Sequence, residues 1–217
     1  MKEGTFVRID YIGRIVESEN IFDLTREDVA KKEGIFNPSF VYGPVPIIVG
    51  ANFVVRGLEK ALKQMKIGDK KKVKVEPNDA FGERNPKLIK LIPLSEFNKQ
   101  SMAPFPGMPI TLNNLNGRVL SVSGGRVRVD FNHPLAGKTL EYEIEIKEKI
   151  TKSTEKVKSI IEFFLKNKNV EVSVSKDTVE IKIKMDITRR IKKTIADTVL
   201  KWVKNIKLIR FIDEFAQ

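Results

Sequence analysis

The sequence predicts an α+β protein made of more than one module, and two kinds of segment support this prediction. The stretch TFVRIDYIGRIV (residues 5–16) alternates apolar and polar residues, as half-buried strands do. The stretch RGLEKALKQMKIGD (56–69) spaces its apolar residues three and four apart, as amphipathic helices do. Such segments start again after residue 150, which indicates a further small module of helices and strands.

The composition excludes several classes of active site. The 217 residues are 41% apolar and 31% charged, which is typical of a globular protein with room for one large domain or two to three small ones. The absence of cysteine excludes disulfides, thiol nucleophiles and zinc–thiolate sites. His133 is the only histidine, so a multi-histidine metal site is excluded as well. We expect neither a metal nor a cofactor.

The positive charge of the chain is unevenly distributed. The net charge of +12 comes from residues 84–131 and 151–217. Nucleic acid is one partner compatible with such charge. We favour a solvated, lysine-rich face of the kind reported for heat-adapted proteins. No apolar run has the length of a signal peptide or a membrane span, so we expect a cytoplasmic protein without a membrane partner.

The first part of the chain contains further helix and strand signals. LTREDVAKKEG (24–34) predicts a short helix that begins with a capping box formed by Thr25 and Asp28. Strands are predicted at 46–50 and 70–77. The apolar face of the helix predicted between these two strands consists of Leu58, Ala61, Leu62 and Met65.

The rest of the chain predicts two hairpins and two longer helices. In 117–131, alternating strands flank the pair Gly124-Gly125. In 169–185, they flank Lys176-Asp177. Helical spacing occurs at 153–168 and 188–205. The last apolar segment, 206–212, fits either a strand or a helix end, so the C-terminal order is predicted as α-β-β-α-β.

Several short motifs, in a consistent order, carry a family resemblance. They are VRIDYIG (7–13), IFD (21–23), PIIVG (46–50), VVRGLEKAL (54–62), MKIGDKKKV (65–73), AFGER (80–84) and GRVRVDFNHPLAGKTL (125–140). With these motifs the chain resembles the FKBP-type peptidyl-prolyl cis-trans isomerases of the SlyD-like kind, in their long archaeal form. The resemblance covers residues 1–150, and residues 151–217 lie outside the family's common core.

The resemblance implies three domains. Residues 1–83 and 132–150 would form the FKBP half-barrel, an antiparallel sheet with a short helix. Residues 84–131 would form an inserted, mainly β chaperone domain, called insert-in-flap, and 151–217 an accessory domain. His133 then lies where the chain returns from the insert. We therefore interpret it as a residue that positions this loop rather than as a catalytic base or metal ligand.

The resemblance also implies a pocket for a prolyl bond. Prolyl isomerisation breaks no σ bond, so it needs an apolar pocket that favours the twisted amide and a few hydrogen bonds that hold it. Tyr11 and Tyr142 would form aromatic walls, Phe22 would pack on the proline ring, and Asp23 would face the twisting carbonyl. The remaining positions are Val45 at the rim, Val54 and Val55 at an apolar edge, Leu58 at the floor and Phe81 at the side.

Two of these positions depart from the family's pattern. Some of the residues are also compatible with an ordinary structural role. The best-known members carry tryptophan at the position of Leu58 and tyrosine at the position of Phe81. The first change reduces the apolar area available to macrolide inhibitors, and the second removes a hydroxyl donor. Val55 and Leu58 are also compatible with an ordinary core role, and Asp23 with the capping of a turn.

The inserted segment is unusually rich in large apolar residues, including methionines. We interpret them as a surface that binds unfolded polypeptides, although part of the set must form the segment's own core. The residues assigned to this surface are Leu88, Ile89, Leu91, Ile92, Phe97, Met102, Phe105 and Met108.

The predicted function is therefore a peptidyl-prolyl cis-trans isomerase and folding chaperone acting on unfolded or proline-containing polypeptides. The alternative is a holdase chaperone with little isomerase activity. Residues 151–217 allow a homodimer through apolar faces around Phe163, Phe164 and Trp202, or equally a monomeric core. Nucleic-acid binding by the basic run at 189–193 is not expected, because no GxxG loop, aromatic RNP pair or helix-turn-helix signal accompanies it.

Overall fold

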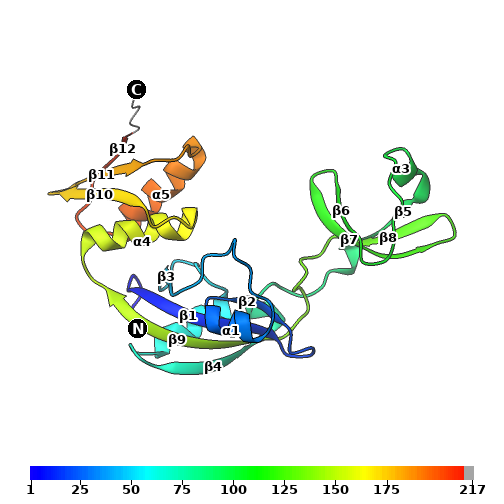
Figure 1. Ribbon diagram of the computed structural model, residues 1–217, viewed down its shortest axis with the longest axis horizontal. Helices are drawn as coiled ribbons and strands as arrows, with labels where there is room; N and C mark the ends of the chain where they lie inside the picture. Colours follow the sequence, from blue (N-terminus) through cyan, green and yellow to red (C-terminus); the bar gives the residue numbers. More distant parts are fainter. Residues whose placement is uncertain (213–217) are drawn as a thin grey trace. The chain divides into compact units, whose positions relative to one another are not determined.

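The computed structural model describes residues 1–212, and its elements are labelled in Figure 1. The chain divides into two compact units. The first comprises residues 1–75 together with the chain from residue 139 onward, and the second comprises residues 76–138. The predicted α+β class is confirmed, with antiparallel sheets and few helices. The second unit is wider than the predicted insert, and the division into three domains stays a prediction.

Five antiparallel strands form the main sheet of the first unit (Figure 1). β1 (Phe6–Ile15) is its centre, because it pairs with β9 (Leu140–Ile150) along one edge. Along its other edge it pairs first with β3 (Val45–Ile48) and then with β2 (Ile21–Leu24). β4 (Lys70–Val75) extends the sheet beyond β9. β1, β3 and β4 overlap the strands predicted at 5–16, 46–50 and 70–77, and the short strand β2 was not predicted.

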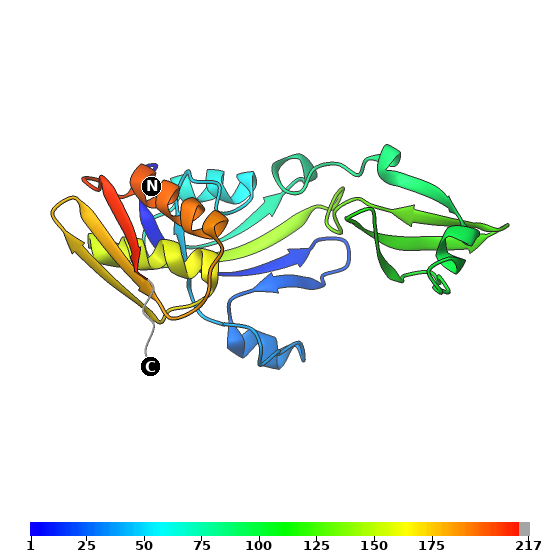
Figure 2. The ribbon, with the colours of Figure 1, turned by 90° about the horizontal axis from the view of Figure 1, so that it is seen from above.

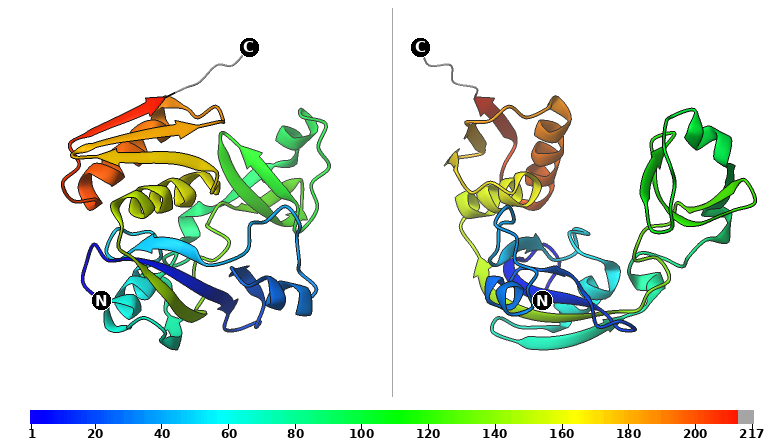
Figure 3. Two further views of the ribbon diagram at one scale, coloured as in Figure 1. Left: turned by 60° about the vertical axis from the view of Figure 1, so that its left-hand side comes forward. Right: turned by 45° about the vertical axis from the view of Figure 1, so that its right-hand side comes forward.

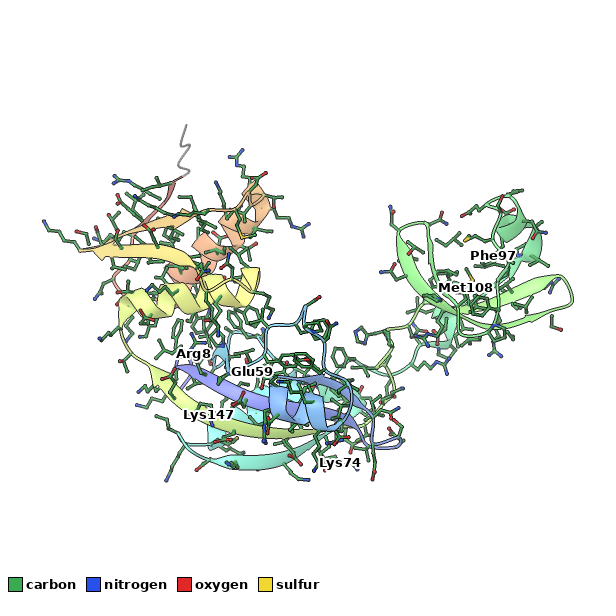
Figure 4. The ribbon with its side chains drawn as sticks, in the orientation of Figure 1. Arg8, Glu59, Lys74, Phe97, Met108 and Lys147 are labelled. Carbon is green, nitrogen blue, oxygen red and sulfur yellow. The ribbon has the colours of Figure 1, made fainter. Side chains whose placement is uncertain are left out.

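Two short helices accompany this sheet. α2 (Arg56–Gln64) turns the predicted apolar face into the core, with Leu58 and Leu62 almost completely buried. On the same helix, buried Glu59 accepts hydrogen bonds from the backbone N–H groups of Gly50 (2.7 Å) and Asn52 (3.1 Å). This carboxylate, labelled in Figure 4, therefore holds the turn that leads into α2. The sequence analysis did not single it out.

The capping box predicted at the start of α1 (Glu27–Lys32) is wrong. The N-cap residue is Arg26, and no side chain caps the helix. The hydroxyl of Thr25 instead donates to Oδ1 of Asp10 (2.7 Å) and accepts from the backbone N–H of Tyr11 (3.0 Å). Because the Thr25 hydroxyl is bonded to β1, it is not available to cap the helix. The same hydroxyl fixes the backbone of Tyr11.

The second unit is built on a four-stranded antiparallel sheet. Its spatial order is β5 (Ile89–Pro93), β8 (Arg126–Asp130), β7 (Leu115–Ser123) and β6 (Pro109–Leu112). The short helix α3 (Leu94–Asn98) follows β5 directly. The predicted hairpin is confirmed, because β7 and β8 are joined through two glycines with positive φ.

Two short 3₁₀-helices, η1 (Pro77–Asp79) and η2 (Pro86–Leu88), precede this sheet. The core of the unit is small and well defined, and Phe97 is its largest member (labelled in Figure 4). Its buried residues are Phe97, Ile110, Val119, Val127 and Val129.

The C-terminal segment has the predicted α-β-β-α-β order. Its elements are α4 (Ser153–Leu165), β10 (Val170–Ser175), β11 (Thr178–Ile183), α5 (Arg189–Trp202) and β12 (Leu208–Ile212). β11 is the middle strand, antiparallel to β10 and parallel to β12. The last segment, for which the sequence left two interpretations, is therefore a strand as far as Ile212.

Helix α4 joins the C-terminal segment to the main sheet. It contacts β10 and α5 on one side and β3 on the other (Figures 2 and 3). One hydrophobic core spans the junction, and it includes Phe6 and Ile150 from the main sheet and Ile160 from α4. The C-terminal segment therefore belongs to the first compact unit rather than forming one of its own.

The apolar residues assigned to a possible homodimer interface pack against other residues of the same chain. The ring of Phe163 stacks on Phe53, with centroids 4.0 Å apart, and Phe164 meets the same ring edge to face. Trp202 packs against the shared core and lies next to Gly4. The monomeric-core interpretation accounts for these three residues. None of the helices described within residues 1–212 has the length and hydropathy that crossing a membrane requires.

Candidate active site

Strand register places three of the predicted pocket residues around one glycine. Gly13 on β1 lies opposite Asp23 on β2 and opposite Tyr142 on β9. Directly paired residues project from the same face of a sheet, and so do residues two apart on one strand. Tyr11 therefore shares this face with Asp23 and Tyr142.

Gly13 makes room for the fourth predicted residue, Phe22. A Cβ atom added at Gly13 would lie 2.6 Å from Cζ of Phe22, well inside van der Waals contact. The missing side chain therefore allows the ring to lie directly on the β1 backbone. Glycine within a strand commonly marks such a close approach, so this signal was present in the sequence but was not used.

The aromatic rings form one cluster beside the Asp23 carboxylate. Tyr142 meets Phe22 edge to face, with centroids 5.6 Å apart, and Tyr11 at 6.2 Å. The Tyr11 hydroxyl donates a 2.6 Å hydrogen bond to Oδ2 of Asp23. Burial raises the pKa of Tyr11, and the nearby Asp23 charge raises it further. Burial and the same carboxylate also raise the pKa of Tyr142, so both phenols are neutral at physiological pH.

Four further predicted residues belong to β3 and to the chain at the start of α2. Val45 is half-buried at the start of β3, and Val54 and Val55 are half-buried just before α2, with Val55 as its N-cap residue. Leu58 is only 2% exposed, so it serves the core and offers almost no free surface as a floor. The structure therefore agrees with the core interpretation of Leu58.

Phe81 belongs to the second compact unit, not to the first. Its ring stacks on His133, with centroids 4.2 Å apart and planes 2° from parallel. His133 Nδ1 accepts a hydrogen bond from the backbone N–H of Leu135, and the His133–Pro134 bond is trans. These contacts give His133 a role in organising its loop, as the sequence analysis expected. Within residues 1–212, no cluster of three His, Asp or Glu side chains is placed to hold a metal.

A pocket of about 280 Å³ opens beside Tyr11 and Asp23. The loop at 39–46 forms one wall, and Phe40 and Val41 in this loop are more than 60% exposed. The end of α4 forms the opposite wall with Glu162, Phe163, Lys166 and Lys168. The contribution of α4 was not predicted, because no local pattern links this helix to β1 or β2.

Comparison with known proteins identifies the family. The chain is 33% identical over 148 residues to the short-type peptidyl-prolyl cis-trans isomerase of Methanocaldococcus jannaschii, covering 68% of this chain and 93% of that protein. It is 38% identical over 113 residues to a probable FKBP-type 16 kDa peptidyl-prolyl cis-trans isomerase of Pseudomonas fluorescens, covering 50% of this chain and 74% of that protein.

The chain belongs to the family of FKBP-type peptidyl-prolyl cis-trans isomerases. The predicted enzyme class is thereby confirmed. SlyD of Helicobacter pylori is 31% identical over 107 residues, covering 48% of this chain and 57% of that protein. The family model described as "FKBP26, IF domain" matches residues 90–135, within the second compact unit.

The residues predicted to form a surface that binds unfolded polypeptides differ in their burial. Phe97 is buried, and Ile92, Met102 and Met108 pack against the same core, so these residues serve the fold of the unit. Ile89 is half-buried. The exposed members are Leu88 (39%), Leu91 (63%) and Phe105 (60%), and Leu115 (57%), which was not predicted, is exposed as well.

Proposed function

We propose that this protein catalyses the cis–trans isomerisation of X-Pro bonds in polypeptides, in the pocket around Tyr11, Phe22, Asp23 and Tyr142. The observation that carries this proposal is the Tyr11–Asp23 hydrogen bond at the edge of an aromatic cluster. It combines an oriented carboxylate with apolar ring surface, and this is the combination that a twisted amide requires. No nucleophile and no general base takes part.

The barrier to be lowered is about 18–20 kcal/mol and arises from amide resonance. When the prolyl amide twists, its nitrogen stops donating into the carbonyl group, and the carbonyl carbon becomes more positive. The carboxylate of Asp23, held by the Tyr11 hydroxyl, stabilises this charge without having to reorganise. The half-buried ring of Phe22 accepts the proline ring and helps to exclude water, and Tyr142, which is only 5% exposed, supports the Phe22 ring by its edge-to-face contact.

We further propose that the second unit captures unfolded chains through its exposed residues Leu88, Leu91 and Phe105. A captured chain keeps its X-Pro bonds at high local concentration near the catalytic residues of the same molecule. Catalysis on protein substrates should therefore exceed catalysis on short peptides. The support for this step is that these large apolar side chains are exposed on one small unit, since contiguous exposed apolar surface marks interaction sites.

Two assays test the two parts separately. Asp23→Ala should lower prolyl exchange in short peptides and in a refolding protein whose slow step is proline isomerisation. The double variant Leu91→Ser/Phe105→Ser should slow refolding and leave peptide exchange unchanged. Leu200→Ser removes an exposed leucine (44%) from α5 and is the control. Unchanged refolding with the double variant would remove the capture step from the proposal.

A holdase with little isomerase activity is the second candidate. Two observations favour it. Phe81 has no hydroxyl group, and the position of the pocket floor is taken by Leu58, which is buried and not aromatic. In that case Asp23→Ala would change neither assay, while Leu91→Ser/Phe105→Ser would still reduce the suppression of aggregation.

A further inference from the structure

The pocket beside Tyr11 and Asp23 is completed by a helix that lies outside the family's common core. Its second wall is the end of α4, with Glu162, Phe163 and Lys166 among its lining residues. We infer that this end of α4 is a subsite for the residues flanking the X-Pro bond, and that it selects substrates with an acidic side chain there. This inference rests on the proposed isomerase function and adds a specificity to it.

The wall is held firmly against the main sheet. Arg8 on β1 donates two hydrogen bonds to the Glu162 carboxylate, at 3.0 and 2.6 Å, and a third to the carbonyl oxygen of Pro44 in the facing loop. Figure 4 shows Arg8 between β1 and α4. Phe163 is fixed by its stack on Phe53. Both walls of the pocket are therefore tied to the same guanidinium group.

The charges around the pocket leave one cation without a carboxylate partner. Asp23 is engaged by the Tyr11 hydroxyl, and Glu162 is paired with Arg8 and, at 3.7 Å, with Lys168. The Lys166 ammonium instead lies 5.1 Å from the centroid of the Phe163 ring. No carboxylate in the described part of the chain forms an ion pair with it. A carboxylate brought by a substrate would therefore meet an available positive charge.

The shape of the subsite suits an acidic side chain with an apolar stem. The ring of Phe163 offers a surface for the methylene groups of glutamate, and the Lys166 ammonium above it is the partner for the carboxylate. The exposed side chains of Phe40 and Val41 on the opposite wall would contact the neighbouring residues of the bound chain. Because Tyr11 and Asp23 line the same pocket, a polypeptide bound beside the Asp23 carboxylate would also reach this wall.

Peptides that differ at one residue next to the X-Pro unit test the subsite. We expect kcat/KM to be about two- to fivefold higher with glutamate than with glutamine at that position, as for a partly exposed ion pair, and the preference should fade as salt is raised. The double variant Lys166→Gln/Lys168→Gln should abolish the preference, so that the glutamate and glutamine peptides are turned over equally. The control variant Lys193→Gln/Lys204→Gln removes the same amount of charge elsewhere in the C-terminal segment and should retain the preference for glutamate.

A second variant tests the subsite in case the first one does not fold. Lys166 has the left-handed conformation at the end of α4 (φ 53°), which glycine adopts without strain, so Lys166→Gly should fold well and also lose the preference. Equal turnover of both peptides by the unmodified protein would overturn the inference while leaving the isomerase proposal intact. If no peptide is turned over, the isomerase proposal fails, and calorimetric titration with the same peptides decides the subsite. Equal affinities would then overturn it.

Discussion

The hydroxyl of Tyr11 and the carboxylate of Asp23 are joined by a 2.6 Å hydrogen bond between adjacent strands. The bond orients a carboxylate that is otherwise exposed, so the two residues should differ in their effect on catalysis. We expect Asp23→Ala to lower kcat/KM for proline peptides about tenfold or more, because it removes the charge itself. Tyr11→Phe should lower it less, about fivefold, because the carboxylate keeps its charge and loses only the hydrogen bond that orients it. Equal losses in the two variants would show that orientation, and not the charge, matters.

The raised pKa of Tyr11 predicts a loss of stability at high pH. The folded-state pKa lies above the unfolded value of about 10, so the contribution of the group is fully present below that pH. It is lost as pH rises from about 10 through the folded pKa, because only the unfolded chain releases the proton. Urea unfolding at pH 8 and pH 11 should show a smaller decrease for Tyr11→Phe than for the unmodified protein. The same decrease in both proteins would contradict this.

The contact between Gly13 and Phe22 predicts that even one methyl group disturbs the pocket. Gly13→Ala would place a carbon 2.6 Å from the Phe22 ring, which must move away. We expect a loss of about 1–3 kcal/mol in the free energy of unfolding, together with a loss of peptide turnover.

Adding Phe22→Leu to this variant should restore the stability but not the turnover, because the smaller side chain fits while the aromatic surface is gone. Full turnover in the double variant would exclude Phe22 from the site.

The ion pair of Arg8 and Glu162 predicts strong coupling between the main sheet and the C-terminal segment. Both side chains are largely buried, with 23% and 12% exposure. Glu162→Gln should cost about 1–3 kcal/mol in stability, because it removes the shorter of the two ion pairs of Arg8 and leaves only Glu148, at 3.3 Å, as its charge partner. Glu155→Gln breaks an exposed pair on the same helix and should cost less than about 1 kcal/mol. Similar costs in urea unfolding would contradict this role of Arg8.

The burial of Phe97 and the exposure of Phe105 predict opposite effects in the second unit. Phe97→Ala should destabilise this unit by about 3–5 kcal/mol, because it opens a cavity in a small core. Phe105→Ala should leave stability within about 0.5 kcal/mol and reduce the capture of unfolded protein. Thermal unfolding and aggregation assays on the two variants separate the core role from the surface role. A stable Phe97→Ala protein would contradict the packing described.

Most elements of this protein were predictable from local patterns. The strands β1, β3 and β4, the hairpin of β7 and β8 and the helices α2, α4 and α5 lie in segments whose apolar pattern predicted them, whereas the short strand β2 was not predicted. The start of α1 was predicted wrongly, because the pattern around Thr25 cannot reveal that Asp10 and Tyr11 compete for its hydroxyl.

The family motifs pointed to Tyr11, Phe22, Asp23 and Tyr142, which the structure brings together, but they did not indicate how the strands do so. That Asp23 and Tyr142 flank Gly13 follows from strand register, which joins segments far apart in the chain. The wall formed by α4 depends on a pair of residues separated by 154 positions, Arg8 and Glu162. Such contacts depend on which faces pack together once the chain has folded. The periodicity of a single segment determines its own secondary structure and leaves its partner undetermined.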